Sequence, residues 1–286
     1  MKTKFLPIAL ALLLAPAVFA QDYEIKLTRP KKAGAEYNLD VAGKQSKDVT
    51  VTSDGAVVKN DKTDTSIQCS GVLKIIEVDA KGQETKTALT IDKFTKTEDG
   101  KDSEVLPKGT VITSSLVDKK TVHTVNDQPV DHSVSELLTA VISLSKGDKS
   151  DDDTVFGTKE RKKKGDSWDV NADEAMKSFE ETTGGGKLEN FAGKTTLEDV
   201  TGDLLKINAH FTTNFRPPLP PAFTVDSSSL EATVSGLFPV DATKIFPEES
   251  TKVAFSFTAH ADGQNGEKIQ IKAKASMETV RKLALK

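Results

Sequence analysis

Polar and apolar residues alternate along two stretches near the C-terminus. Apolar residues occupy every second position from Val253 to Ala261, and again from Ile269 to Met277 after the polar link 262–267. Successive side chains of a strand point to opposite faces of a sheet, so this period of two predicts two long antiparallel strands joined by a turn. One face of this hairpin is apolar and the other is polar.

The same alternation recurs in two blocks of the chain. The first block spans residues 21–126 and the second spans 187–283, and both contain stretches of alternation of more than ten residues. Antiparallel strands of that length twist and coil. The pattern therefore predicts an α+β, mainly β fold, in which two meanders form a long coiled antiparallel sheet shaped like half a barrel.

The alternation changes phase once within the second block. Apolar residues fall on odd positions at Phe223 and Val225 but on even positions at Leu230 and Ala232. A slip of one residue would turn core side chains to solvent. We therefore predict a β-bulge or a bend within Ser227–Ser229.

Two amphipathic helices are predicted in the segment 131–186 that joins the meanders. Ser133 and Glu136 have the spacing of a capping box, an apolar stripe at helical spacing follows over 134–144, and Gly147 is placed to end the helix. Asn171 and Glu174 repeat the capping pattern before a second helix that ends at the glycine run 184–186. These helices are expected to cover one side of the sheet.

The first twenty residues have the pattern of a signal peptide. Lys2 and Lys4 precede an apolar run over 5–18, and small residues lead to a cleavage position between Ala20 and Gln21. No later stretch approaches the length of a membrane-spanning helix. The sequence therefore predicts an exported, periplasmic or extracellular protein that does not span a membrane, with residues 21–286 forming one β-rich domain.

Charge and cysteine content exclude several classes of function. The formal net charge of the 286 residues is −4, which gives no general attraction to nucleic acid. The single cysteine, Cys69, cannot form a disulfide within the chain, and it shares a face with Ile67 and Leu73. It is expected to be a small buried residue and not a nucleophile.

One tripeptide suggests catalysis, but its context does not. Gly165-Asp166-Ser167 resembles the nucleophile block of an esterase family, which lies near the start of the mature chain and is followed by an Asp-x-x-His motif. Here it lies in the middle of the chain, and neither His210 nor His260 has Asp three residues before it. A catalytic triad is defined by its partners, so we predict that the protein is not an enzyme.

Metal-binding patterns are also incomplete. His210 and His260 fall on the polar faces of predicted strands and could be neighbours across the sheet, but further zinc ligands are missing. The acidic segment of Asp148 and 151–153 fails as a calcium loop because its twelfth position is Lys159. We predict no metal and no cofactor, and interpret the acidic segment as a solvated loop.

Two further polar or proline-rich segments are interpreted as structural. The basic run 159–164 follows the acidic one, and the two are expected to screen each other in solvent; contact of the basic run with anionic polymers or lipid headgroups is the alternative. The run 216–221 contains four prolines and is expected to be a stiff extended connector between strands.

The predicted layout resembles that of the periplasmic lipoprotein carriers and their lipid-binding relatives. The turn Gly165-Asp166-Ser167-Trp168 is also similar to one that recurs in uncharacterised exported bacterial β-rich families. The resemblance covers the pattern of the mature chain, and it implies a half-barrel sheet whose concave side faces a lipid or a lipoprotein.

Three functions are therefore carried forward. The first is binding of a lipid or another hydrophobic ligand in the concave face of the sheet. The second is an interaction module of the cell envelope that acts through exposed sheet edges, and the third is a hydrolase. The predicted lining of the first site is apolar and comes from the first helix and three strands: Leu137, Leu138, Val141, Ile142, Phe211, Phe215, Phe255, Phe257, Ile269 and Ile271.

Overall fold

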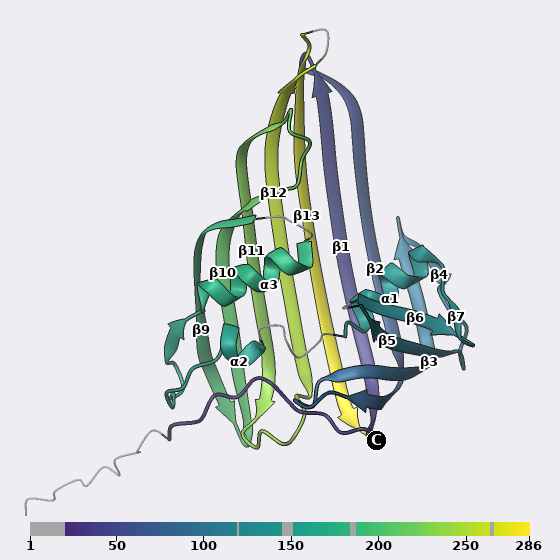
Figure 1. Cartoon of the computed structure of the whole chain (residues 1–286), viewed down its shortest axis with the longest axis vertical. Helices are drawn as coiled ribbons and strands as arrows, with labels where there is room; N and C mark the ends of the chain where they lie inside the picture. The colour runs from purple at the N-terminus through teal and green to yellow at the C-terminus, as the bar shows by residue number, and fades with distance from the viewer. Residues whose placement is uncertain (1–20, 119, 145–150, 184–186, 264–265) are drawn as a thin grey trace, which may run out of the picture.

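The computed structural model describes residues 21–118, 120–144, 151–183, 187–263 and 266–286. Within these residues, thirteen strands form one open antiparallel sheet (Figure 1). The predicted fold class, mainly β with a long antiparallel sheet, is confirmed. The strands are β1 (Glu36–Ser53), β2 (Ala56–Val78), β3 (Glu84–Glu98), β4 (Lys101–Glu104), β5 (Val111–Val117), β6 (Lys120–Val125), β7 (Gln128–Pro129), β8 (Ser167–Asp169), β9 (Lys187–Thr201), β10 (Leu204–Arg216), β11 (Thr224–Pro239), β12 (Glu248–Asp262) and β13 (Lys268–Leu285).

The first and last long strands are neighbours in the middle of the sheet. The strand order is β7-β6-β5-β3-β2-β1-β13-β12-β11-β10-β9-β8, and β4 pairs with β3 beside this path. β1 pairs with β13 from Tyr37 opposite Leu285 to Ser53 opposite Ile269. The two predicted meanders are thereby joined into one sheet by hydrogen bonds between their terminal strands.

Several strands are longer than the sequence pattern indicated. Apolar residues alternate continuously in this region only from about Thr65, but β2 starts at Ala56 and has 23 residues. Its polar first part pairs with β1, and the turn between them places Asp54 and Gly55 at positive φ. Ladder hydrogen bonds need no apolar side chains, so a polar stretch extends the hairpin where hydrophobic periodicity gives no signal.

Three helices lie in the described part of the chain, one more than predicted. They are α1 (His132–Val141), α2 (Asp152–Val155) and α3 (Ala172–Thr183). The capping box predicted at Ser133 is wrong, because Asp131 is the N-cap of α1 and makes no side-chain cap bond. The cap predicted for α3 is confirmed, since Asn171 Oδ1 accepts from the Glu174 amide at 3.4 Å. Gly147 and 184–186 lie outside the described residues.

The short helix α2 replaces the solvated acidic loop expected from the sequence. Asp151 Oδ1 accepts hydrogen bonds from the amide and hydroxyl of Thr154, at 2.8 and 2.6 Å, and thereby caps the helix. Asp153 Oδ1 accepts from the Leu27 amide at 2.5 Å. The acidic residues therefore fasten the N-terminal segment and α2 to each other, while Asp148 lies outside the described residues.

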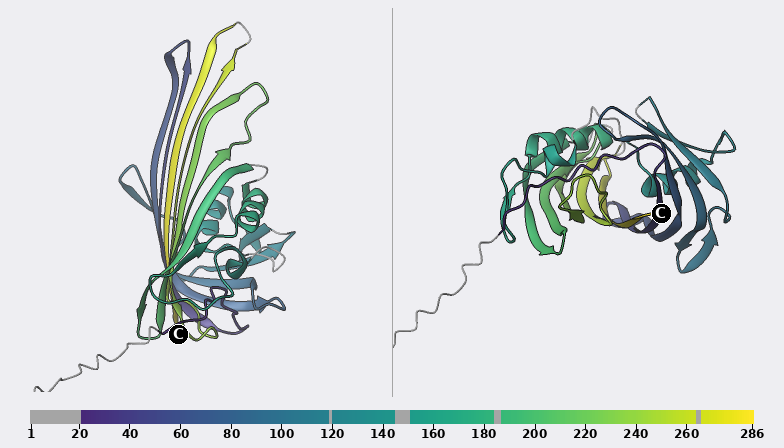
Figure 2. Two further views of the ribbon diagram at one scale, coloured as in Figure 1. Left: turned by 90° about the vertical axis from the view of Figure 1, so that its left-hand side faces the viewer. Right: turned by 90° about the horizontal axis from the view of Figure 1, so that it is seen from below.

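The two faces of the sheet differ in what covers them. We call the face that carries α1 and α3 the inner face; it receives the odd-numbered side chains of β1, β12 and β13. The opposite face is the outer face. Figure 2 shows that the helices cover only one end of the inner face, while the ends of the sheet that carry the β1–β2 and β12–β13 turns rise well beyond them. The long hairpins therefore have an inner face without a helical layer over their far halves.

The core consists of two clusters at the helix-bearing end. The first lies between α1 and strands β1, β2, β3 and β5, and includes Leu138, Val141 and Phe94. The second joins the N-terminal segment to β9, β10 and β11, and includes Ile25, Leu27 and Trp168. Phe246, in the connection before β12, packs against both clusters. Together they anchor the base of the sheet.

The predicted bulge is present, one residue before the predicted segment. The pairing of β11 with β12 runs from Val225 opposite Ala259 to Ser227 opposite Thr258, so Asp226 is the additional residue. The slip returns Leu230 to the inner face, where it is buried. The proline-rich connector is also confirmed, since 217–223 joins β10 to β11.

No helix in the ranges that the structure covers has the length and apolar character required to cross a bilayer. The predicted signal peptide, with Ala20, lies outside the described residues, which begin at Gln21.

Candidate functional site

The far half of the inner face carries large apolar side chains that are only partly covered. Phe255 and Phe257 on β12 and Ile269 and Ile271 on β13 are all half-buried. Small alanines alternate with them across the ladder, as where Phe257 faces Ala273 and Ala259 faces Ile271. We call this surface, consisting of Phe215, Val253, Phe255, Phe257, Ile269 and Ile271, the apolar track.

The structure brings together five of the ten predicted lining residues on this track. Phe215 lies edge-on to Phe255, with ring centroids 6.2 Å apart. Phe211 is separated from them: it stacks on Phe191 at 5.1 Å and on Phe156 at 6.4 Å. Phe211 therefore packs under the segment that contains α2, whereas Phe215 belongs to the open surface.

The four predicted lining residues of the first helix also divide into buried core residues and one partly exposed residue. Leu138, Val141 and Ile142 are buried in the first core cluster, so their side chains are occupied by packing. Leu137 is half-buried and lines a cavity of about 440 Å³ between α1 and the inner face. Ile142 also follows α1 in extended conformation and is not part of the helix.

This cavity, which we call the α1 cavity, lies at the lower end of the apolar track. Met277 on β13 lines it, is 42% exposed, and pairs across the ladder with Val253 of the track and with Gln45. Its volume falls in the range of small-molecule sites. Its wall combines apolar and hydrogen-bonding groups: Gly43, Lys44, Gln45, Thr65, Ile67, Glu136, Leu137, Thr139, Ala140, Met277 and Thr279.

Sequence reasoning missed the polar part of the α1 cavity. Gln45 and Lys47 interrupt the apolar positions of β1 between Val41 and Val49, and this interruption is the signal that marks the place. A polar residue on the predicted apolar face can be recognised in the sequence. Its neighbours on β2 and α1 cannot, because they are brought there by the sheet order.

The inner face becomes charged below the α1 cavity. Glu249 and Arg281 are cross-strand partners, and Arg281 Nη2 donates to the Val141 carbonyl at 2.7 Å, where α1 ends. Burial, together with the smaller effect of the nearby Glu249 charge, raises the pKa of the Asp152 carboxyl to about 6. The Asp152 residue is exposed to solvent although protein atoms lie close to its carboxyl, so the effect of burial on its charge is reduced by water.

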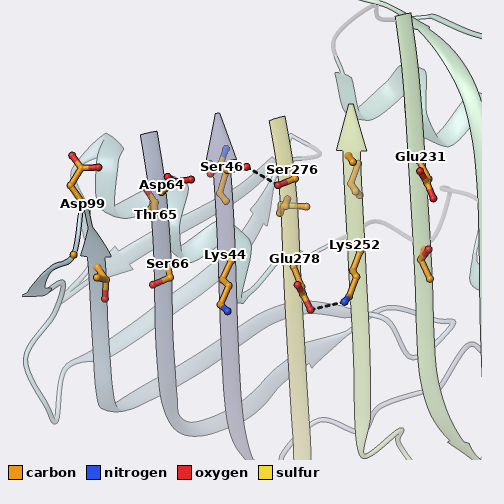
Figure 3. A pocket seen from close by; sticks show the side chains of 17 residues that line it. Lys44, Ser46, Asp64, Thr65, Ser66, Asp99, Glu231, Lys252, Ser276 and Glu278 are labelled. Atoms are coloured by element: carbon orange, nitrogen blue, oxygen red, sulfur yellow. Dashed lines mark hydrogen bonds and ion pairs between the residues drawn. The ribbon is translucent and has the colours of Figure 1, made fainter. Parts of the chain in front are cut away.

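A second hollow, of about 910 Å³, lies on the outer face (Figure 3). Its side chains carry both charges, and two cross-strand contacts hold them: Ser46 Oγ to Ser276 Oγ at 2.7 Å, and Lys252 Nζ to Glu278 Oε1 at 3.0 Å. Cross-strand pairs of this kind support the ladder and keep the face hydrated. The sequence predicted a polar outer face but gave no indication that it is hollowed.

The histidines do not form the neighbouring pair considered from the sequence. His210 lies opposite Thr233 and bonds its hydroxyl at 3.2 Å, whereas His260 lies opposite Thr224 and bonds Asp226 Oδ1 at 2.6 Å. They are not adjacent, because β11 lies between β10 and β12, and the residue of β12 that is level with His210 is Lys252, eight residues before His260. Across the residues that the structure describes, no group of three His, Cys, Asp or Glu side chains could hold a metal ion.

The structure also locates the two candidate nucleophiles. Cys69 is 1% exposed, as expected, and burial raises the pKa of its thiol to about 12, with a further contribution from Asp40. Ser167 lies on β8 at the end of the sheet order, where its hydroxyl is 2.8 Å from that of Thr196. The neighbouring Trp168 is buried and donates to the Phe156 carbonyl at 2.8 Å.

The basic run 159–164 is paired with acidic groups other than those expected. Arg161 Nε contacts Asp22 Oδ1 at 2.7 Å, Lys162 Nζ contacts Glu160 Oε2 at 2.6 Å, and Lys164 Nζ contacts Asp199 Oδ1 at 2.5 Å. Of the expected partners, Asp151 bonds Thr154 and Asp153 bonds the Leu27 amide. Charge compensation therefore comes from the N-terminal segment, the run itself and β9.

The ends of the sheet leave little backbone for strand addition. The terminal strands β7 and β8 have two and three residues, and β7 includes Pro129. β2 pairs with β3 only from Thr65 onward, so its first part borders open space, but that part carries Lys59, Asp61 and Lys62. Short strands, proline and charged edge residues all oppose edge-to-edge pairing.

Comparisons with known proteins give only distant likenesses. No protein-family model matches the chain, and no curated protein matches it. Among solved structures, it is similar to lipovitellin, in a structure described by its lipid–protein interactions, at a TM-score of 0.39 and 7% identity over 89% of this chain and 25% of that one. The chain thus spans about a quarter of the length of lipovitellin.

Two bacterial outer-membrane proteins are also similar in their β-rich architecture. The outer membrane protein OprG from Pseudomonas aeruginosa has a TM-score of 0.22 and 9% identity, over 90% of this chain and 99% of that one. An outer membrane channel from Pseudomonas putida F1 has a TM-score of 0.21 and 10% identity, over 91% of this chain and 100% of that one. These structures do not support the specific resemblance to periplasmic lipoprotein carriers that the sequence pattern suggested.

Proposed function

We propose that this chain is an exported, non-enzymatic protein that binds a lipid or another apolar molecule on the inner face of its long strands. The observation that carries the proposal is the apolar track. Phe255, Phe257, Ile269 and Ile271 share one face of the sheet and keep part of their surface exposed, on hairpins whose far ends rise beyond the helices (Figure 2). Contiguous apolar surface of this kind is typical of a binding site.

The location of the track supports a ligand more than a protein strand. The long hairpins hold the aromatic and aliphatic side chains on hydrogen-bonded β-strands, which position them before any ligand arrives. The second hypothesis, pairing through sheet edges, needs accessible strands, and the edges of this sheet are short or charged. The face of the sheet therefore offers more to a partner than its edges do.

The first experiment is to purify the mature protein without detergent and to analyse an organic extract by mass spectrometry. A lipid or lipoprotein-derived chain in stoichiometric amount supports the proposal. Intact mass of the protein recovered outside the cytoplasm tests its export, with loss of residues 1–20 as the expected result. An extract free of any apolar compound, from protein that also binds no neutral fluorescent probe such as N-phenyl-1-naphthylamine, would contradict ligand binding.

A matched pair of variants on β12 locates the site. Phe257→Ser removes an aromatic side chain from the apolar track, whereas Thr258→Ser changes the next residue, which faces outward. We expect Phe257→Ser to weaken probe binding roughly tenfold, because an apolar contact of this size contributes about 1.5–3 kcal/mol when fully covered. Thr258→Ser should bind as the wild type does, and equal losses in both variants would place the ligand elsewhere.

A further inference from the structure

The inner face changes from polar to apolar along each central strand. On β13 the inward residues are Arg281 and Thr279 at the lower level, then Met277, Ala275 and Ala273, then Ile271 and Ile269. On β12, Glu249 and Thr251 precede Val253, Phe255 and Phe257. The register places these transitions side by side, since Thr251 faces Thr279 and Val253 faces Met277. A polar band therefore borders the lower end of the apolar track.

The α1 cavity lies on this border and is closed below. Gln45, Thr139 and Thr279 bring hydrogen-bonding groups to its wall, and Met277 joins it to the track. Beneath it, Leu138 and Val141 fill the first core cluster, and the guanidinium of Arg281 is bonded to the end of α1. The route from the cavity to the apolar track therefore runs upward along the strands, past Met277.

We propose that the ligand is an amphiphile that lies along β12 and β13, with its polar end in the α1 cavity and its apolar chain on the apolar track. This inference rests on the proposed function and adds the class and the orientation of the ligand. From Met277 to Ile269 the strand advances eight residues, or roughly 26 Å at about 3.3 Å per residue. One bilayer leaflet is about 15 Å of hydrocarbon, so an extended lipid chain fits within that length.

The charge at the α1 cavity determines which polar headgroup of the amphiphile can bind there. Glu136 of α1 contributes a carboxylate to the wall, 3.3 Å from His132 Nε2. Lys44 borders the same cavity, but its side chain lies in the outer hollow, as Figure 3 shows. An uncharged, hydroxyl-bearing end is therefore accepted, through Gln45 and the threonine hydroxyls, while an anionic end meets the Glu136 charge.

The orientation is tested on the wild-type protein with two photoreactive monoacylglycerols. One carries a diazirine at the terminal carbon of its chain and the other next to its glycerol, and adducts are mapped by mass spectrometry. We expect the first to label peptides of the apolar track, around Phe257 and Ile271, and the second to label Leu137–Ala140 or Met277. Reversed or coincident labelling, or labelling of the outer face, would overturn the proposed orientation while leaving ligand binding intact. Labelling by neither probe would count against the proposed function itself.

The selection is tested by comparing a monoacylglycerol with the fatty acid of the same chain. We expect the wild type to prefer the monoacylglycerol by about fivefold, the effect of one like charge at close range in a wet site. Glu136→Gln should remove most of that preference, whereas Glu231→Gln, in the outer hollow, should retain it. An unchanged preference in Glu136→Gln would show that the polar end does not lie at α1.

Discussion

The imidazole Nε2 of His123 on β6 lies 3.3 Å from the hydroxyl oxygen of Thr139 on α1. The Thr139 hydroxyl donates its own hydrogen to the Ser135 carbonyl, at 2.9 Å, so it must accept from His123. His123 therefore carries a hydrogen on Nε2, and in the neutral imidazole, which burial favours by lowering the pKa, Nδ1 accepts from the Ser114 hydroxyl at 2.8 Å. The buried His123 side chain thus connects α1, which forms one wall of the α1 cavity, to the β5–β6 hairpin.

This connection predicts that acid destabilises the fold through His123. The side chain is 2% exposed, and burial lowers the pKa of its imidazole below the ordinary value. As the pH falls, the unfolded chain therefore binds a proton on His123 before the folded protein does. The stability that neutral His123 contributes is complete above about pH 6.5 and is lost as the pH falls toward the lower pKa of the folded state. The measurement is the free energy of urea unfolding at about pH 7.5 and about pH 5.

A glutamine at this position retains hydrogen bonding but cannot titrate. His123→Gln should lower stability at neutral pH by about 1–3 kcal/mol, because its geometry satisfies the two hydroxyls less well. Its loss of stability on acidification should be smaller than that of the wild type. His210→Gln, on the exposed outer face, is the control, and an equal acid response in wild type and His123→Gln would refute the assignment.

Asp152 predicts an effect of the opposite sign. Its pKa is raised to about 6, chiefly by burial, so the folded state holds the proton more tightly than the unfolded chain does. The stability that this contributes is present at low pH and is lost as the pH rises through about 6. Asp152→Asn, which mimics the protonated form, should therefore stabilise the protein at about pH 7.5 and have little effect near pH 4.

The expected gain for Asp152→Asn is about 1 kcal/mol, below the ~3 kcal/mol that the full shift would give, because the side chain retains contact with solvent. Glu249→Gln serves as the second variant. It removes the charge that contributes most to the raised pKa, so the pH at which the wild-type stability declines should move downward. A destabilised Asp152→Asn at neutral pH would mean that the carboxylate is needed in its charged form.

Variants of two adjacent leucines on α1 distinguish the contribution of core packing to stability from the contribution of the α1 cavity to ligand binding. Leu138 is 0% exposed within the first core cluster, so Leu138→Ala should cost about 2–5 kcal/mol of unfolding free energy. Leu137 is half-buried at the α1 cavity, and Leu137→Ala should cost roughly 1 kcal/mol or less. Leu137→Ala should weaken binding of the fluorescent probe although it leaves the protein almost as stable as the wild type. An unchanged affinity in that variant would show that α1 is not part of the binding site.

The parts of this fold that the sequence predicted are those with a strong local pattern. Alternation at 253–261 and 269–277 identified β12 and β13, and the phase slip located the bulge to within one residue. Each of these signals depends on residues a few positions apart. They also indicated correctly which side chains share a face.

The parts that could not be predicted depend on which strands become neighbours. Nothing near Tyr37 shows that its strand pairs with the one ending at Leu285, yet this pairing makes a single sheet of the two meanders. The same applies to the α1 cavity, where Gln45, Glu136 and Met277 come from three distant segments. Leu138 and Leu137 also looked alike in the apolar stripe, and only the packing of α1 against β6 and the core distinguishes them.

Cys69 provides a test of the core that is independent of any ligand. Its thiol lies on β2 opposite Val41 and Phe94, is 1% exposed, and has a pKa raised to about 12 by burial. The reactive thiolate is therefore almost absent at about pH 8, and an external reagent reaches the sulfur only when the strands separate. Labelling of the native protein with a thiol reagent should proceed at the rate of opening of the core, and become fast in denaturant. Leu138→Ala should accelerate it strongly, because that variant opens a cavity inside the same cluster, whereas Leu137→Ala, which packs only against the edge of the cluster, should accelerate it less. Labelling of the folded wild type at the rate of a free thiol would show that the first core cluster is open to solvent.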